Sequence, residues 1–437
     1  MTELTLICTP LKPAVMAGFD NQLDVLVRLR APALPDTAPT RAPLNLAIVL
    51  DRSGSMSGQP LAEAKRCAHY VINRLGPQDR AALVVYDNEI TVAAPSTPVL
   101  DKKVFHAAID RVQSGGTTAL HGGWLAGAGQ VSEAIDPETI TRVILLSDGQ
   151  ANVGLQDVDK IAAQCAQLAE AGVSTSTYGL GRSFNEDLMV AMARAGQGNA
   201  YYGQTAADLM DPFQEEFDLL SALCARRLRL RVAAAPGVTA TVLNDLPMDA
   251  DGAYRLLDLA YGGEAWAVVR LTIGADRLRE AGESLAFAPV DLMFHYEDLG
   301  GHPHSVTAAP LALPVLPPAA FGAVPQDALV ARRIAELEAA NLQDAAQQAA
   351  RHGDWQQVNT LLDQAKANAK DNPWLDQVVD GLRDLAAAGD AQQFAKETAY
   401  QSTKMRTRLA PAAEMADLVA AAPSYLRRKI QQGKGDV

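Results

Sequence analysis

The sequence predicts a multidomain fold of the α/β plus β plus α class. A parallel α/β domain is inserted into an antiparallel β-sandwich, and a helical C-terminal domain follows. Three observations predict this arrangement. Strand-like and helix-like segments alternate between residues 45 and 222, which is typical of a parallel sheet with helices on both faces. Segments with period-two alternation lie on both sides of this region, and residues 326–402 have helical periodicity.

The α/β region begins with a continuous apolar run, NLAIVL (45–50), as expected for a strand buried on both faces. From Pro60 onward, apolar residues recur at helical spacing, and a proline is favourable at a helix start. Three further strand-like runs follow in the sequence: AALVVYD (81–87), RVILLSD (142–148) and VSTSTYGL (173–180).

The flanking segments indicate the sandwich. Residues 2–8 and 21–30 alternate apolar and polar side chains, and so do several segments between 225 and 316. Two strands rarely form a stable sheet alone. We therefore expect the first two strands to pair with the later ones, which makes the α/β domain an insertion.

The predicted domains are the following: N-terminal strands of the sandwich at 1–42, the α/β domain at 43–224, the rest of the sandwich at 225–318, a helical domain at 319–408, and an Ala/Pro-rich linker with a basic tail at 409–437. Within the helical region, GDWQQV (353–358) recurs as GDAQQF (389–394). This repeat weakly resembles tetratricopeptide-type repeats, and a plain helical hairpin is the preferred interpretation.

Composition excludes several classes of function. The 437-residue chain has a formal net charge of −13, so we expect neither nucleic acid nor an anionic membrane surface as its partner. The four cysteines are far apart and are expected to be unpaired core thiols. The N-terminus lacks a basic segment, and no apolar run reaches the roughly 18 residues of a membrane span. The sequence therefore favours a cytoplasmic protein.

Oxygen-bearing side chains follow two of the predicted strands. Asp51 ends the first strand and is followed by Ser53 and Ser55, while Asp148 ends a later strand and Thr117 follows a pair of glycines. In an open parallel sheet, ligands bind beyond the carboxyl ends of the strands. Two carboxylates and three hydroxyls suit Mg²⁺ or Mn²⁺ rather than zinc, with Ca²⁺ as a further alternative. These five residues are the predicted metal ligands.

The same motifs resemble the metal-ion-dependent adhesion site (MIDAS) of von Willebrand factor type A (VWA) domains. The matching elements are DxSxS from Asp51, GGT at Thr117 and LLSDG at Asp148. In addition, residues 176–189 and 196–209 resemble the last strand–helix–strand unit of this family.

The resemblance covers about residues 44–222 and implies a Rossmann-like domain. It also implies that the three hydroxyls reach the metal directly or through water, and that the two aspartates hold it mainly through waters and hydrogen bonds. Thr118 takes the place of Thr117 if the register of the loop differs by one residue. The arrangement of the whole chain is similar to that of bacterial intracellular VWA proteins.

We therefore expect a metal-dependent protein-interaction or adaptor protein without catalytic residues, whose protein partner supplies an Asp or Glu to Mg²⁺. One alternative is a metal-dependent hydrolase, for which His121 is the nearest candidate general base. Another alternative, which the resemblance suggests, is a co-chaperone or adaptor of an AAA+ ATPase or of a kinase–phosphatase pair.

Other motifs have ordinary explanations. Aspartates after strands often cap helices. Here, however, the order of all five predicted ligands along the chain favours the metal site. His302 and His304 lie in a predicted hairpin turn rather than in a metal site, and GLGRSF (179–184) lacks the third glycine of a dinucleotide fingerprint. The basic residues 427–429 are expected to be a solvated helix end.

Overall fold

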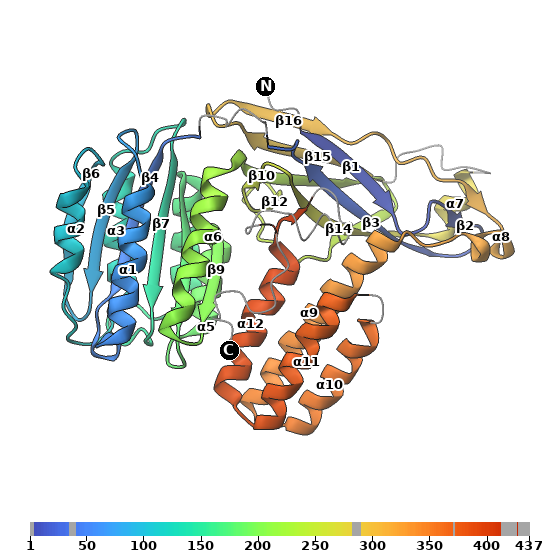
Figure 1. Ribbon diagram of the computed structural model, residues 1–437. Coiled ribbons are helices and arrows are strands. Elements are labelled where there is room, and N and C mark those ends of the chain that lie inside the picture. The colour runs from blue at the N-terminus through green and yellow to red at the C-terminus, as the bar shows by residue number, and fades with distance from the viewer. Residues whose placement is uncertain (1–3, 35–40, 282–289, 370–371, 412–425, 427–437) are drawn as a thin grey trace.

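The computed structural model describes residues 4–34, 41–281, 290–369, 372–411 and 426. In Figure 1, the α/β unit lies at one side of the molecule, and antiparallel sheets lie at the other. A group of C-terminal helices, drawn in orange and red, lies below the sheets and beside the α/β unit. The basic residues 427–429 lie outside the described part of the chain.

A six-stranded sheet forms the centre of the α/β unit. The spatial order of its strands is β6-β5-β4-β7-β8-β9, and all neighbours are parallel except β5 and β6. The strands are β4 (Leu44–Asp51), β5 (Arg80–Tyr86), β6 (Ile90–Pro98), β7 (Ile140–Ser147), β8 (Val173–Leu180) and β9 (Gln197–Gly203).

Helices cover both faces of this sheet, as the sequence predicts. Alternate residues of β4 belong to two hydrophobic cores: Ile48 packs in one and Val49 in the other. The first core contains residues of α1 (Gln59–Arg74), α2 (Lys102–Asp110) and α6 (Met210–Ser221). The second contains residues of α3 (Leu120–Ser132), α4 (Val158–Glu170) and α5 (Glu186–Ala195).

Two antiparallel sheets adjoin the α/β unit. One runs β1-β3-β14-β11, with β18 also paired to β14; the other runs β12-β10-β15-β16, with β13 also paired to β10. The strands of the first sheet are β1 (Thr5–Pro10), β3 (Asn21–Arg30), β11 (Val238–Val242), β14 (Gly263–Ile273) and β18 (Ala410–Pro411). Those of the second are β10 (Leu223–Ala234), β12 (Tyr254–Arg255), β13 (Leu259–Ala260), β15 (Val290–Glu297) and β16 (Pro303–Thr307).

The N-terminal strands pair with later strands, as expected from their sequence. β3 pairs along its whole length with β14, from Asn21 opposite Ile273 to Arg30 opposite Glu264. Val27 of one sheet and Phe294 of the other belong to the same hydrophobic core. In addition, β2 (Val15–Met16) forms a short parallel pair with β17 (Val315–Leu316), which links the N-terminal segment to the segment after β16.

The C-terminal region is helical. Its helices are α8 (Pro318–Ala323), α9 (Ala328–Arg351), α10 (Trp355–Asn368), α11 (Pro373–Ala388) and α12 (Ala391–Thr407), and a further short helix, α7 (Ala275–Ala281), follows β14. The recurring hexamer marks two helix starts, because Asp354 and Asp390 each accept a hydrogen bond from a backbone amide three residues later. An aspartate in this position satisfies an amide that the first helical turn leaves free.

The four cysteines are free. Cys67, Cys165 and Cys224 are buried, as expected for core thiols, whereas Cys8 is only half-buried. Among the described residues, no helix has both the length and the hydropathy that crossing a bilayer requires.

Candidate metal centre

Asp51 lies at the carboxyl end of β4, where two hydrogen bonds fix its carboxylate. The Ser147 hydroxyl donates to one oxygen at 2.7 Å, and the Ser53 amide donates to the other at 2.8 Å. Ser147 is the last residue of β7, the parallel neighbour of β4. The adjacency of these two strands therefore brings the DxSxS turn and the later aspartate to one edge of the sheet.

The next turn of the chain brings both serine hydroxyls to this edge. A short 3₁₀ helix, η1 (Gly54–Met56), follows β4. The hydroxyl oxygens of Ser53 and Ser55 are 3.1 Å apart, and Ser55 donates to Asp148 at 2.8 Å. We call Asp51, Ser53, Ser55 and Asp148 the oxygen rim. The structure brings together these four residues that the sequence analysis selected.

At the fifth position, the two successive threonines that the sequence offers lie in different surroundings. Thr117 is exposed, whereas the neighbouring Thr118 is buried, with 4% of its surface exposed. A Cβ placed on Gly149 would lie 3.0 Å from the Thr118 hydroxyl and 3.8 Å from that of Ser55. The Thr118 hydroxyl therefore lies near the oxygen rim, beside Gly149. Sequence reasoning had no signal to choose between two successive threonines.

Both carboxylates are in surroundings that disfavour their charge. Burial raises the pKa of Asp51, although the hydrogen bonds from Ser53 and Ser147 oppose this. Burial, together with the nearby Asp51, raises the pKa of Asp148 to about 6, although the Ser55 hydroxyl opposes this. Within the described part of the chain, neither aspartate forms an ion pair with a lysine or arginine. Arg52, between the motif residues, pairs instead with Asp87 at 3.2 Å.

The oxygen rim and Thr118 fit a divalent cation. Two carboxylates and three hydroxyls are hard oxygen donors, which Mg²⁺, Mn²⁺ and Ca²⁺ prefer. No group of three or more His, Cys, Asp or Glu side chains able to hold a metal occurs among the described residues. A metal at this rim would therefore depend on the hydroxyls as well as on the aspartates.

The histidines considered on sequence have other partners. His121 forms a hydrogen bond of 2.7 Å with Gln164 on α4. His302 and His304 both contact the carboxylate of Asp298, which also accepts backbone hydrogen bonds in the turn between β15 and β16. These contacts account for the three histidines without a metal.

Residues 45–215 match the von Willebrand factor type A domain, and this confirms the VWA domain predicted for that part of the chain. Among curated relatives, the uncharacterized protein sll0103 of Synechocystis sp. is 28% identical over 210 residues, covering 48% of this chain and 49% of that protein. The uncharacterized protein YfbK of Escherichia coli K12 is 30% identical over 194 residues, covering 44% of this chain and 34% of that protein. The chain therefore matches half or less of the length of these relatives.

The likeness in structure extends beyond the VWA domain. A von Willebrand factor type A protein from Catenulispora acidiphila superposes with a TM-score of 0.71 at 17% sequence identity, over 92% of this chain and 97% of that one. At this identity the match shows a shared fold. It includes the antiparallel sheets and helices, because the VWA domain alone is less than half of the chain.

Proposed function

We propose that this chain is an interaction protein whose VWA domain binds one divalent metal ion and, through it, an acidic side chain of a protein partner. VWA domains often mediate metal-dependent protein–protein interactions. The observation that carries the proposal is the oxygen rim, where two buried carboxylates meet hydroxyls and have no cationic partner in the described structure. Asp51, Ser53, Ser55, Asp148 and Thr118 (or Thr117, the first choice on sequence) would hold the metal.

The partner's chemistry follows from charge. This chain carries −13 overall, and the rim adds two aspartates at the docking point. Without a cation, an incoming carboxylate would meet like charges in a partly desolvated site, which is unfavourable. A divalent cation would supply a Lewis-acidic position that prefers hard oxygen. An amide or a lysine of the partner would gain much less there.

Mg²⁺ or Mn²⁺ is the proposed metal, with Ca²⁺ as the alternative. The shared core of the two antiparallel sheets supports the proposal that the VWA domain, at 43–224, is inserted into a β-sandwich formed by 1–42 and 225–318. A helical domain at 319–408 completes the proposed architecture. β18, which pairs with β14 in the first sheet, lies at the start of the segment that was expected to be a linker. The hydrolase alternative gains no support, because His121 is bonded to Gln164 and the relatives above carry no enzymatic name.

A thermal-shift titration of the full chain with MgCl₂, MnCl₂ and CaCl₂ tests the metal site. Binding to the folded state raises the melting temperature by mass action. Asp51→Asn and Asp148→Asn should each abolish the shift. Asp384→Asn is the control, because Asp384 lies on α11, far from the rim in the sequence, and this variant should keep the shift. Equal shifts in all four proteins would overturn the metal site.

The partner claim needs a second experiment. The 437-residue chain is used as bait in two parallel pull-downs, one with Mg²⁺ and one with EDTA. Any partner recovered is then titrated against the bait. We expect EDTA to abolish binding, Mg²⁺ to restore it, and one acidic residue of the partner to be indispensable. Affinity that EDTA leaves unchanged would place the contact away from the oxygen rim.

A further inference from the structure

Helices α1 and α2 of the VWA domain carry the same motif, in which a lysine, a histidine and an asparagine or aspartate are spaced four residues apart. On α1 these residues are Lys65, His69 and Asn73, and on α2 they are Lys102, His106 and Asp110. Side chains four residues apart lie on one face of a helix. Each helix therefore presents one row of three polar side chains.

The two histidines lie where these rows meet. Their Nδ1 atoms are 2.7 Å apart. Their outer nitrogens reach across to the opposite helix: Nε2 of His69 is 3.1 Å from the Asp110 carboxylate, and Nε2 of His106 is 3.1 Å from the side-chain oxygen of Asn73. We call His69, His106, Asn73 and Asp110 the imidazole site.

These contacts determine where the hydrogen lies on each ring. A carboxylate or an amide oxygen only accepts hydrogen bonds, so both Nε2 atoms carry a hydrogen and donate it. A neutral imidazole has a single ring hydrogen. Neither Nδ1 atom therefore has a hydrogen to donate, and two lone pairs face each other across 2.7 Å. A cation bound by both nitrogens would make this contact favourable.

The chemistry of the site fits a late transition metal. Unprotonated imidazole nitrogens bind Zn²⁺, Cu²⁺ and Ni²⁺. An acceptor on the other ring nitrogen is usual for such ligands, because it orients the ring and makes it more basic. Metal–nitrogen distances of roughly 2.0–2.1 Å place two ligands roughly 2.9 Å apart at a right angle and roughly 3.3 Å apart in a tetrahedron. The observed 2.7 Å is closer to the right angle, which Cu²⁺ and Ni²⁺ favour.

The hydrophobic core holds both helices in place. Cys67 of α1 and Phe105 and Ile109 of α2 are buried in the same core. Ligands on such rigid elements lose little freedom when they bind a metal. The rings themselves are accessible, because the His69 side chain is 28% exposed and His106 is half-buried. Water can therefore fill the remaining coordination positions.

The lysines fasten the two ends of the helix pair. Lys65 donates to the Asp110 carbonyl at 3.0 Å, and Lys102 donates to the Asn73 carbonyl at 2.7 Å. Both carbonyls belong to the last turns of their helices, where a cation is favourable. The lysine ammonium groups are thus engaged at main-chain oxygens, while the Asp110 carboxylate places a negative charge beside the rings.

The imidazole site is separate from the oxygen rim. His69 follows the first residue of α1 by ten positions, about 15 Å along the helix, whereas the rim lies before this helix in the chain. In Figure 1, α2 lies at the outer side of the VWA domain, away from the antiparallel sheets. The two sites also differ in chemistry, because oxygen donors suit Mg²⁺ and Mn²⁺, whereas imidazoles suit late transition metals.

We propose that His69 and His106 bind one Cu²⁺ or Ni²⁺ ion through their Nδ1 atoms, while Asp110 and Asn73 orient the two rings. The ion connects α1 with α2, so its binding stabilises the folded VWA domain. This site does not depend on the function proposed above.

Calorimetric titration of the untagged full chain with NiCl₂ tests the site, with MgCl₂ in excess to supply the oxygen rim. We expect one Ni²⁺ to bind per chain. His69→Ala and His106→Ala should each raise the Kd at least about tenfold, since even the loss of a residue behind a metal ligand commonly costs about 10–100-fold. His352→Ala, at an exposed histidine that ends α9, is the matched control and should leave the Kd unchanged.

Two reciprocal substitutions test the orienting residues. Asp110→Asn should raise the Kd for Ni²⁺ about tenfold, because the outer nitrogen of His69 loses its carboxylate. Asn73→Asp should lower the Kd about threefold, because a carboxylate makes His106 a better ligand. A gain in affinity does not arise from damage to the fold, so this variant separates metal binding from a structural role of the motif.

No binding of Ni²⁺ to the wild-type chain, or binding that both histidine variants retain, would overturn the proposal. Such results would mean that the two rings share a proton rather than a metal. Asp51→Asn, which should abolish the Mg²⁺-dependent thermal shift, should keep the affinity for Ni²⁺. Failure of one metal site is therefore distinguishable from failure of the other.

Discussion

At the scale of single residues, the fifth oxygen donor of the proposed metal site depends on the register of one loop. Thr118 is held by a 2.9 Å hydrogen bond from its amide to the Asn152 side chain, while its neighbour Thr117 is exposed. Gly116, with a φ of 69°, makes this turn possible because a side chain there would strike Asn88. This loop geometry favours Thr118 as the fifth oxygen donor, and the choice between the two threonines stays a prediction.

Thr118→Ala should weaken Mg²⁺ binding at least about tenfold, since even changes to residues behind the ligands of a metal commonly cost about 10–100-fold. Thr117→Ala is the matched control and should leave the affinity unchanged. Thermal-shift titrations with Mg²⁺ measure both. The opposite ranking of the two variants would assign the ligand position to Thr117.

Asp298 offers a residue-scale prediction on pH. Its burial favours the neutral form, but hydrogen bonds from His304 and from the His302 amide outweigh this and lower its pKa to about 2. Because the pKa is lower in the folded state than the ordinary 3.8, Asp298 stabilises the fold above about pH 4, and this contribution is lost as the pH falls towards 2.

Asp298→Asn should therefore lower the free energy of unfolding at pH 7 by less than about 1 kcal/mol, because the side chain is partly solvated. At about pH 3 the difference between wild type and variant should be smaller. Urea denaturation at the two pH values measures it. A difference that does not change with pH would show that the histidine contacts leave the pKa of Asp298 unaltered.

At the scale of elements, the sequence predicted those strands whose side-chain pattern reflects burial. Residues 45–50 form a nearly continuous apolar run because β4 lies between two other strands and under helices on both faces. β6 was missed because it is a largely exposed edge strand. Ile90, Thr91 and Val92 favour a strand, but Pro95 and Pro98 interrupt the pattern, so the strand signal of the whole segment is weak.

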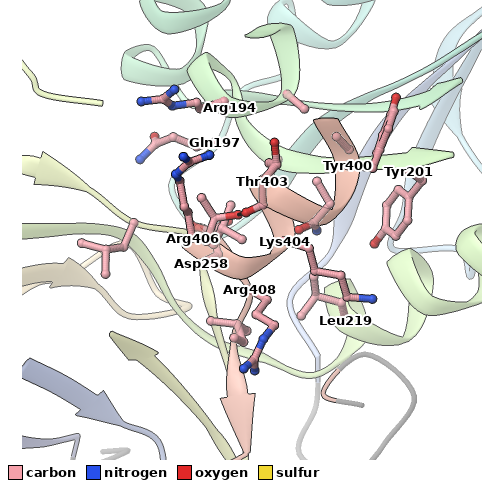
Figure 2. Close-up of a pocket in the computed structure, with 18 of the residues that line it drawn as sticks. Arg194, Gln197, Tyr201, Leu219, Asp258, Tyr400, Thr403, Lys404, Arg406 and Arg408 are labelled. Atoms are coloured by element: carbon pink, nitrogen blue, oxygen red, sulfur yellow. Dashed lines mark hydrogen bonds between the residues drawn. The ribbon is translucent and has the colours of Figure 1, made fainter. Parts of the chain in front are cut away.

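The oxygen rim was predicted from sequence for a similar reason. Asp51 and Asp148 directly follow two strand-like apolar segments, and the neighbouring positions of β4 and β7 bring those strand ends together. Contacts between distant parts of the chain could not be predicted in this way. Gln197, Arg255 and Tyr400 line one junction of three parts of the chain (Figure 2), but no local pattern in the sequence connects them.

The pairing of β3 with β14 gives an element-scale prediction. Leu29 of β3 is fully buried opposite Ala265, whereas Leu34, just after the strand, is 54% exposed. Leu29→Ala should lower the free energy of unfolding by about 2–5 kcal/mol, because it leaves a cavity in the core. Leu34→Ala should change it by less than about 0.5 kcal/mol.

Calorimetry of the full chain measures both leucine variants. The transition that contains the antiparallel sheets should move to lower temperature in Leu29→Ala alone. Equal melting profiles for the two variants would mean that the N-terminal strand contributes little to the stability of the sheet.

At the scale of the whole molecule, buried ion pairs hold the VWA domain against its neighbours. Arg142 of β7 bonds to Glu216 of α6 at 2.7 Å and also reaches Asp258, beyond the VWA domain, at 3.3 Å. On the helical side, Lys396 of α12 donates to the Phe184 carbonyl and pairs with Glu186, both at 2.8 Å. The VWA domain is thus fixed to the antiparallel region and to the helices by buried charged contacts.

Removal of the Lys396 charge tests this attachment. Lys396 is 3% exposed, and its loss leaves Glu186 partly buried with Arg351 as its remaining cationic partner in the described structure. Breaking a buried pair from one side commonly costs about 3–5 kcal/mol. Lys396→Met should therefore lower the free energy of unfolding by about 3 kcal/mol, at the low end of that range because Arg351 keeps part of the compensation.

The matched control is Lys366→Met, since Lys366 also contacts two acidic side chains, Asp376 and Asp380, but does so at the surface of the helices. Exposed pairs contribute little to stability because water and salt screen them. Calorimetry should therefore show a large shift for Lys396→Met and a small one for Lys366→Met, while both variants keep the Mg²⁺-dependent shift of the oxygen rim. Comparable shifts in the two variants would mean that the contact between α12 and the VWA domain contributes no more stability than a surface ion pair.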